Sequence, residues 1–214
     1  MRITVLISGR GSNMIALCKG ATDYSVGAVL SNNSEAEGLA WARDQGIAAL
    51  CVSREKGIPK EVFHKKLLGV VQDTAPDLVV LAGFMVILPS AFVAAYPSKI
   101  VNIHPSLLPR HPGLNTHARA LAEGDSHHGC TVHLVDEGID SGPILAQARI
   151  PIHSDDTATT LAERTLLEEH QLYSWVINAM ARGEIRAEKQ RIIYSEKITQ
   201  VASKVGFVLS TPRS

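Results

Sequence analysis

The sequence predicts an α/β fold with a mostly parallel sheet and an antiparallel C-terminal portion. In the first half, short β-branched runs alternate with segments of helical period, a pattern that favours right-handed crossover units and a parallel sheet. In the second half, Cys130–Val135 alternates in the manner of a strand with one covered face, and Pro143–Ile152 follows after a short connection. These two segments are predicted to be neighbouring strands.

The first half supplies the parallel portion. Strands are expected at Ile3–Ser8, Val26–Ser31, Ala48–Val52 and Leu78–Gly83. Helices are expected between them, at Asn13–Lys19, Glu35–Gln45 and Pro59–Asp73. The run that begins at Leu78 is apolar on both faces, which predicts a central strand of a parallel sheet.

The second half continues the prediction with a different set of elements. They are a strand at Ile100–Ile103, a Pro-rich loop from Pro105 to Gly113, a short helix at Thr116–Glu123 and the longest helix at Thr157–Arg182. Gly183 stands where a C-terminal helix cap belongs. The Pro-rich turn makes Leu108–Pro109 a candidate cis peptide. We expect one domain over residues 1–186 and a C-terminal tail, residues 187–214, packed on it.

Composition limits the classes of partner. The 214 residues carry equal numbers of basic and acidic side chains, 21 of each, which argues against bulk binding to nucleic acid or to an anionic membrane. No stretch approaches the roughly 20 apolar residues that span a bilayer. Cytoplasm is therefore the expected location.

Cysteine and histidine patterns argue against a metal site. Cys18, Cys51 and Cys130 are scattered and are interpreted as buried apolar residues in a reducing compartment. The nine histidines lack the spacing of a helical or ribbon metal site. We interpret the histidines outside the motif described below as surface or pocket residues, and expect no metal.

A small-residue loop joins the first predicted strand to the first predicted helix. Its sequence is Ser8-Gly9-Arg10-Gly11-Ser12-Asn13, and backbone N–H groups at such a helix start make an anion site. Met14 stands where a dinucleotide fingerprint has a third small residue, so the loop suits a single phosphate better than a dinucleotide. From the residues alone, a tight turn without a ligand remains an equal alternative.

A polar pair ends the strand that begins at Ile100. Asn102 and His104 are two positions apart, so their side chains share a face, and an amide beside an imidazole suits an oxyanion site. The alternative is that both satisfy loop backbone groups. The acidic loop Asp136–Gly142 offers a carboxylate partner for His104, and spacing does not choose between Asp136, Glu137 and Asp140.

Ligands of parallel α/β sheets bind outside the carboxyl ends of the strands. We therefore expect three loops to surround one crevice. They are Gly9–Asn13, Gly83–Leu88 and Asn102–Ser106.

Taken together, these motifs resemble the phosphoribosylglycinamide formyltransferases. The matching segments are Ser8–Asn13, Leu81–Met85, Asn102–Pro109, Pro112–Leu114 with Thr116-His117, and Asp140–Pro143. The resemblance runs in order from residue 1 to about Gly183. It implies a single Rossmann-like formyltransferase domain that transfers the formyl group of 10-formyltetrahydrofolate to the amine of glycinamide ribonucleotide in purine biosynthesis. It implies small-molecule partners only, and a monomer or a homodimer.

The resemblance also implies roles for individual residues. Gly11, Ser12 and Asn13 would hold the ribonucleotide phosphate, and Glu169 would bind the ribose hydroxyls. Asn102 and His104 would polarise the formyl oxygen, with Asp140 as the partner of His104. The folate-binding residues would be Lys60, Met85, Val86, Ile87, Leu88, Asn102, Asp136 and Asp140.

Three positions depart from the family pattern. Val86 and Lys60 stand where relatives often carry Arg, and Asn115 replaces a His seen in some relatives. Two other functions stay open beside formyl transfer to the ribonucleotide. They are a formyltetrahydrofolate hydrolase, which would transfer to water, and a non-catalytic protein that binds a phosphoribosyl ligand. Methionyl-tRNA formyltransferases add a basic domain, which this chain of neutral net charge lacks.

Overall fold

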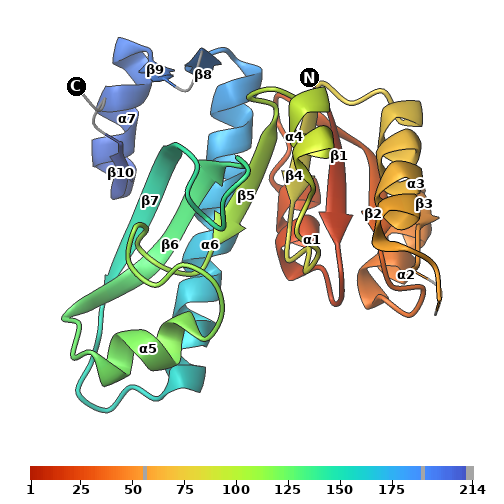
Figure 1. The fold of residues 1–214 in the computed structure, drawn as a ribbon. Coiled ribbons are helices and arrows are strands. Elements are labelled where there is room, and N and C mark those ends of the chain that lie inside the picture. Colours follow the sequence, from red (N-terminus) through yellow and green to blue (C-terminus); the bar gives the residue numbers. More distant parts are fainter. Residues whose placement is uncertain (55–56, 189–190, 211–214) are drawn as a thin grey trace. The chain divides into compact units, whose positions relative to one another are not determined.

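The computed structural model describes residues 1–54, 57–188 and 191–210. The chain forms two compact units, Met1–Val101 and Asn102–Ser214. Each unit has strands and helices of its own (Figure 1).

The first unit is built on a parallel sheet. Its elements are β1 (Arg2–Ile7), α1 (Ser12–Lys19), β2 (Ser25–Ser31), α2 (Glu37–Asp44), β3 (Ala48–Cys51), α3 (Lys60–Asp73), β4 (Leu78–Leu81) and α4 (Ser90–Ala95). The strands lie in the order β4-β1-β2-β3, and each neighbouring pair is parallel. The chain therefore moves outward from β1 to β3 and then returns through α3 to the other side of β1. This reversal is a topological switch point beside the carboxyl ends of β1 and β4.

The two strands at the switch point are the most buried of this unit. Ile3 to Ile7 of β1 and all of β4 are buried, which agrees with the apolar character predicted for the strand at Leu78. Thr4 is the polar exception, and its hydroxyl lies 2.7 Å from the hydroxyl of Thr74 at the end of α3. Because both strands are fixed by packing on their two faces, the loops that leave them start from rigid positions.

The second unit contains the antiparallel portion. Its elements are the last residues of β5 (Ile100–His104), α5 (Thr116–Ala122), β6 (His127–Leu134), β7 (Ile144–Pro151), α6 (Ala158–Ala181), β8 (Ile185–Glu188), β9 (Arg191–Tyr194), α7 (Glu196–Val205) and β10 (Phe207–Leu209). Strand β7 pairs antiparallel with β6 and with β10, and α6 packs on β6 and β7. The predicted α/β class, with mostly parallel strands and an antiparallel C-terminal portion, is confirmed.

Several details differ from the sequence predictions. Helices α4 and α7 and strands β8 and β10 were not predicted. Strands β8 and β10 and helix α4 are too short to show a clear period. Residues 189–190 and 211–214 of the predicted tail lie outside the described residues. Cys51 is exposed and Cys18 is half-buried, so the prediction of buried cysteines is right only for Cys130.

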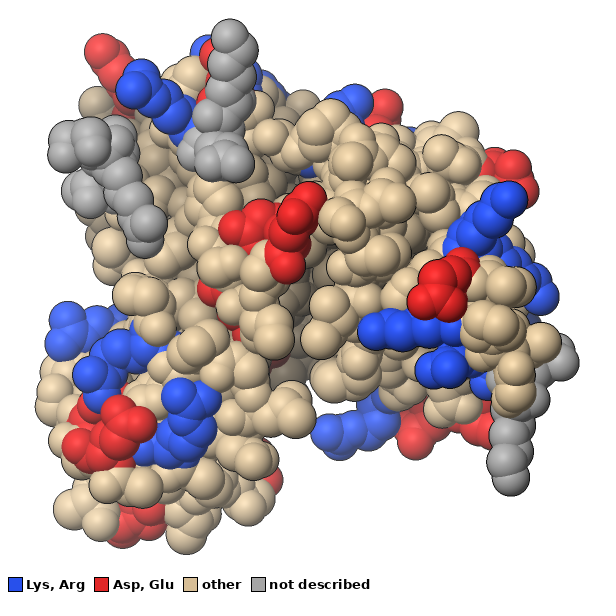
Figure 2. All heavy atoms as spheres, viewed as in Figure 1, with Lys and Arg blue, Asp and Glu red and all other residues tan. Residues whose placement is uncertain are grey.

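Three further observations complete the description of the fold. The peptide bond Leu108–Pro109 is cis, as proposed for the Pro-rich turn. Within residues 1–54, 57–188 and 191–210, none of the helices is both long enough and apolar enough to cross a membrane. Acidic and basic side chains are interspersed on the face of each unit shown in Figure 2.

Helix α6 begins with a capping box. The Thr157 hydroxyl accepts a hydrogen bond from the Thr160 N–H at 3.2 Å, and the Thr160 hydroxyl accepts one from the Thr157 N–H at 2.9 Å. These bonds satisfy donors that the first helical turn leaves without partners. The helix then buries Leu161, Leu172 and Tyr173 in the core of the second unit.

We predict that Thr157→Ala lowers the free energy of unfolding by about 1 kcal/mol, because an uncapped donor is left at the helix start. Urea denaturation followed by circular dichroism measures this change. Thr159→Ala, at an exposed position in the same turn, is the matched control and should leave stability nearly unchanged. Equal stability of the two variants would contradict the role of the cap.

Candidate active site

In the first unit, Ser8 joins the loops at the switch point. Its hydroxyl donates to the Asn32 side-chain oxygen at 2.6 Å and accepts from the Met85 N–H at 2.8 Å. Its backbone N–H donates to the Gly83 carbonyl at 3.2 Å. One serine after β1 therefore holds the segments that follow β2 and β4.

The predicted phosphate loop leads directly into α1. Gly11 has a φ of 75°, and a Cβ there would lie 3.2 Å from the Cα of Gly38 and 3.0 Å from Met14 Cε. Only glycine suits that conformation without strain. Within the part of the chain that the structure describes, no side chain caps the start of α1. The first backbone N–H groups of the helix can therefore serve an anion.

The predicted folate-binding residues of the first unit have unequal exposure. Met85 and Ile87 are exposed to 71% and 62%, whereas Leu88 is buried. Val86 is half-buried, and Lys60 is an exposed residue at the start of α3. Leu88 can contribute little more than backbone to a ligand, while Met85 and Ile87 offer apolar side chains.

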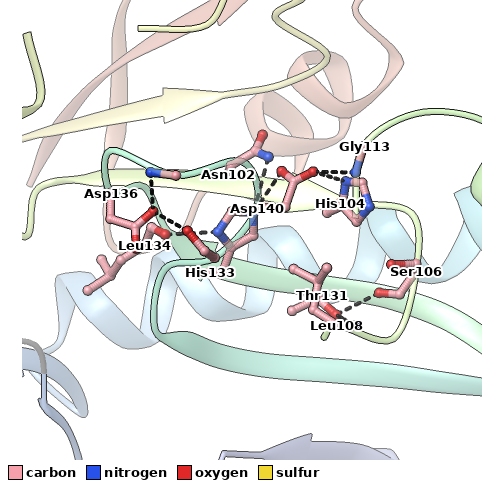
Figure 3. Close-up of polar contacts among 12 residues, drawn as sticks. Asn102, His104, Ser106, Leu108, Gly113, Thr131, His133, Leu134, Asp136 and Asp140 are labelled. Carbon is pink, nitrogen blue, oxygen red and sulfur yellow. Dashed lines mark hydrogen bonds and ion pairs between the residues drawn. The ribbon is translucent and has the colours of Figure 1, made fainter. Parts of the chain in front are cut away.

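In the second unit, the structure brings Asn102, His104 and Asp140 together (Figure 3). His104 Nδ1 lies 3.3 Å from Asp140 Oδ2, and the same carboxylate oxygen accepts a hydrogen bond from the Gly113 N–H at 2.9 Å. Asp140 has a φ of 50°, a left-handed conformation that Asp tolerates better than most residues. The geometry thus selects Asp140 from the three acids of its loop.

The other two acids of that loop do not reach His104. Asp136 Oδ1 accepts hydrogen bonds from the Gly138 N–H at 3.0 Å and from the Ser141 hydroxyl at 2.8 Å, so its carboxylate orders its own loop. Glu137 is exposed. Asp136 therefore stabilises the loop, whereas Asp140 lies beside the imidazole of His104.

His133 of β6 completes the cluster, although it was interpreted from the sequence as a surface or pocket residue. Its Nδ1 lies 2.8 Å from the Leu134 carbonyl, and its Nε2 lies 3.2 Å from Asn102 Nδ2 and 3.6 Å from Asp140 Oδ1. Burial lowers the pKa of His133, so the neutral ring is favoured. A neutral ring that donates from Nδ1 can accept from the Asn102 amide and orient it. The available signal was its position in the alternating segment Cys130–Val135.

Glu169 stands on α6 and is 8% exposed. Burial, and after it the charge of Glu169, raise the pKa of Cys130 on β6. The Glu169 carboxylate therefore lies on the side of α6 that faces this strand. A buried acid on a rigid helix is well placed to bind a hydroxyl-bearing ligand, because its orientation is fixed in advance.

Comparison with known proteins places this geometry in a family. The formyl transferase family model matches residues 1–177. The chain belongs to the formyl transferase family. Phosphoribosylglycinamide formyltransferase of Escherichia coli strain K12 is 43% identical over 190 residues, which cover 87% of this chain and 90% of that protein.

Solved structures of family members have the same fold. Glycinamide ribonucleotide transformylase 1 from Symbiobacterium toebii superposes with a TM-score of 0.86 at 39% identity, over 91% of this chain and 94% of that one. A formyltetrahydrofolate deformylase from Pseudomonas syringae pv. tomato has a TM-score of 0.84 at 22% identity, over 91% of this chain and 66% of that one. The second likeness concerns the fold alone. The Rossmann-like formyltransferase fold predicted from the motifs is thereby confirmed.

Two further histidines of this formyl transferase, His111 and His128, are buried, and His117 beside them is half-buried. The rings of His117 and His128 have centroids 4.9 Å apart, and those of His111 and His128 lie 6.5 Å apart. Burial, and after it the charges of His117 and His111, lower the pKa of His128 to about 4. Burial and then the charge of His104 also lower the pKa of His117. The sequence interpretation was that these histidines are surface or pocket residues, and the burial of His111 and His128 excludes the surface alternative for those two.

The low pKa of His128 predicts an acid-sensitive fold. Between the ordinary value of about 6.5 and the folded value of about 4, only the unfolded chain binds the proton. His128 therefore contributes its stability in full above about pH 6.5, and this contribution is lost as the pH falls toward 4. The integrated loss is about 3 kcal/mol.

Urea denaturation between about pH 4 and pH 7 tests this slope. His128 has a hydrogen bond with the backbone of Pro105. His128→Asn removes the titrating ring and retains a donor for that partner, so stability should fall less steeply with acid than in the wild type. His153→Asn, at an exposed position, is the control and should keep the wild-type slope. A His128→Asn slope as steep as the wild type would contradict the prediction.

Proposed function

We propose that this chain transfers the formyl group of 10-formyltetrahydrofolate to the amine of glycinamide ribonucleotide. The observation that carries the proposal is the contact of His104 with Asp140 beside Asn102, in a chain whose relatives are phosphoribosylglycinamide formyltransferases. The proposed domain spans residues 1–186, with residues 187–214 as its tail. The small-molecule substrates and the free thiols support a cytoplasmic enzyme.

The chemistry begins with attack of the ribonucleotide amine on the formyl carbon. The carbonyl oxygen then becomes an oxyanion, which hydrogen-bond donors stabilise more strongly than the neutral carbonyl. His104 supplies one such donor. Its Nδ1 faces the Asp140 carboxylate at 3.3 Å and its Nε2 faces the His111 carbonyl at 2.9 Å. In the imidazolium, the Nε2–H is held by the His111 carbonyl, and the Nδ1–H, at its longer distance from Asp140, is the proton that can be shared with the oxyanion.

Asn102 supplies the second donor. One N–H of its amide points to His133 Nε2 at 3.2 Å, and the amide carries a second N–H. Asn102 is half-buried, so its side chain is accessible to a substrate on the strand face that it shares with His104. A water or His104 relays the proton from the amine to the departing folate nitrogen.

Other residues bind and orient the two substrates in this proposal. Gly11, Ser12 and Asn13 hold the ribonucleotide phosphate at the start of α1, and Glu169 binds the ribose hydroxyls. Met85 to Leu88 and Lys60 contact the folate, with Asp136 and Asp140 contributing from their loop. Val86 offers an apolar contact where relatives often place a charged one.

Turnover tests the assignment of His104 and Asp140. Loss of one oxyanion donor costs on the order of 3 kcal/mol, or roughly a hundred-fold in turnover. His104→Ala and Asp140→Asn should therefore lower kcat by about that factor and change KM far less. Asp155→Asn, an exposed acid outside the cluster, is the matched control. Near-normal kcat in folded His104→Ala and Asp140→Asn would overturn the assignment.

The acceptor is tested in the same assay. Deformylation of 10-formyltetrahydrofolate is followed by absorbance, with and without glycinamide ribonucleotide. Turnover that requires the ribonucleotide supports transfer. Turnover without it would instead identify a hydrolase, and binding of both compounds without turnover would identify a non-catalytic protein.

A further inference from the structure

The carbonyl that faces His104 belongs to a residue with an unusual conformation. His111 has a φ of 53°, and a left-handed residue other than glycine needs support from its surroundings. Its carbonyl oxygen lies 2.9 Å from His104 Nε2 and accepts a hydrogen bond from the Ser106 hydroxyl at 3.2 Å. Because the loop from Pro105 to Gly113 has little regular structure, something must hold the peptide at His111 in place.

The side chain of His111 supplies that support. It is 3% exposed, and its Nε2 lies 2.7 Å from Asp125 Oδ2. Asp125 follows α5, where its N–H donates to the Ala120 carbonyl at 3.0 Å. The hydrogen bond from His111 is the largest cause that lowers the pKa of Asp125. The loop is thereby joined to the end of a helix through one buried imidazole.

Arg110 reinforces the carboxylate from the solvent side. Its guanidinium contacts Asp125 Oδ1 at 2.5 Å and Glu123 Oε2 at 2.9 Å, and acidic and basic side chains gather over the α5 end of the unit (Figure 2). One ring nitrogen of His111 and one carboxylate oxygen each of Glu123 and Asp125 lie within 4.8 Å of one another. These three atoms are close enough together to coordinate one cation. The guanidinium already donates hydrogen bonds to both carboxylates and offsets part of their charge, so the cluster is better explained as an anchor than as a metal site.

We propose that His111 is a positioning residue whose side chain, hydrogen-bonded to Asp125, holds its own carbonyl against His104 Nε2. The carbonyl holds the Nε2–H and thereby fixes the ring orientation, so that the Nδ1–H lies beside Asp140 and can be shared with the formyl oxygen. The inference rests on the proposed catalytic role of His104. It adds a series of contacts that runs from Asp125, outside the catalytic cluster, through His111 to the imidazole of His104.

The first test removes the tether at either end. Substitution of a residue that orients a catalytic group without contacting the substrate lowers activity by about tenfold or more. His111→Gly and Asp125→Ala should therefore lower kcat about tenfold with KM nearly unchanged. Glycine adopts the left-handed conformation freely, so His111→Gly removes the side chain without adding backbone strain. Asp125→Asn keeps an oxygen that accepts the His111 N–H and should restore most of kcat.

Glu123→Gln is the matched control. Its carboxylate contacts Arg110 but stays 3.6 Å from His111 Nδ1, beyond hydrogen-bond distance, so kcat should remain near that of the wild type. If His111→Gly does not fold, the Asp125 pair carries the test. Equal loss of kcat in Asp125→Ala and Asp125→Asn, or wild-type kcat in folded Asp125→Ala, would overturn the proposal.

A spectroscopic readout separates this inference from the proposed function. In protein with ¹⁵N-labelled imidazoles, the proton on His104 Nε2 should exchange slowly in the wild type and faster in His111→Gly and Asp125→Ala. Unchanged exchange in Asp125→Ala would overturn the tether whether or not the enzyme is active. Absence of ribonucleotide-dependent turnover in the wild type would overturn the function and leave the tether intact.

Discussion

The Asp140 carboxylate is the group on which the cluster of Asn102, His104 and His133 depends. A carboxylate in a largely buried position costs free energy unless hydrogen bonds and opposite charge compensate its lost hydration. Asp140 accepts from the Gly113 N–H and faces His104 and His133. These contacts fix the loop that carries Asp140 and orient the imidazole of His104. The charge of Asp140 raises the pKa of His133, but burial of that ring outweighs this effect and lowers the pKa. One compensated charge therefore organises residues from three separate segments.

The loops around this carboxylate hold several residues in left-handed conformations. Asp140, His111 and Asn115 have φ values of 50°, 53° and 57°. Such conformations cost free energy and persist where surrounding contacts over-determine them. At Asp140 those contacts come from Gly113 and His104, and at His111 they come from Asp125. The strain is thus matched by hydrogen bonds on both sides of the imidazole.

In the first unit, uncharged hydroxyl and backbone groups hold the loops in position. Ser8 connects the segments after β1, β2 and β4 through one hydroxyl and one backbone N–H. Gly11 allows α1 to start close to Gly38. Backbone groups therefore remain available for ligands at the switch point of the sheet, as general rules for parallel α/β sheets lead one to expect.

The sequence by itself determined the alternation of strands and helices, the small-residue loop before α1 and the shared face of Asn102 and His104. These features depend on local periods and on backbone freedom, which neighbouring residues encode directly. Residue spacing did not distinguish Asp140 from Asp136 and Glu137. The family resemblance implied Asp140, and the tertiary structure gives the physical reason, since the loop path brings Asp140 to Gly113, 27 positions away. It also revealed His133 and His111. Their importance comes from partners on other elements, and no local pattern specifies which buried histidine meets which acid.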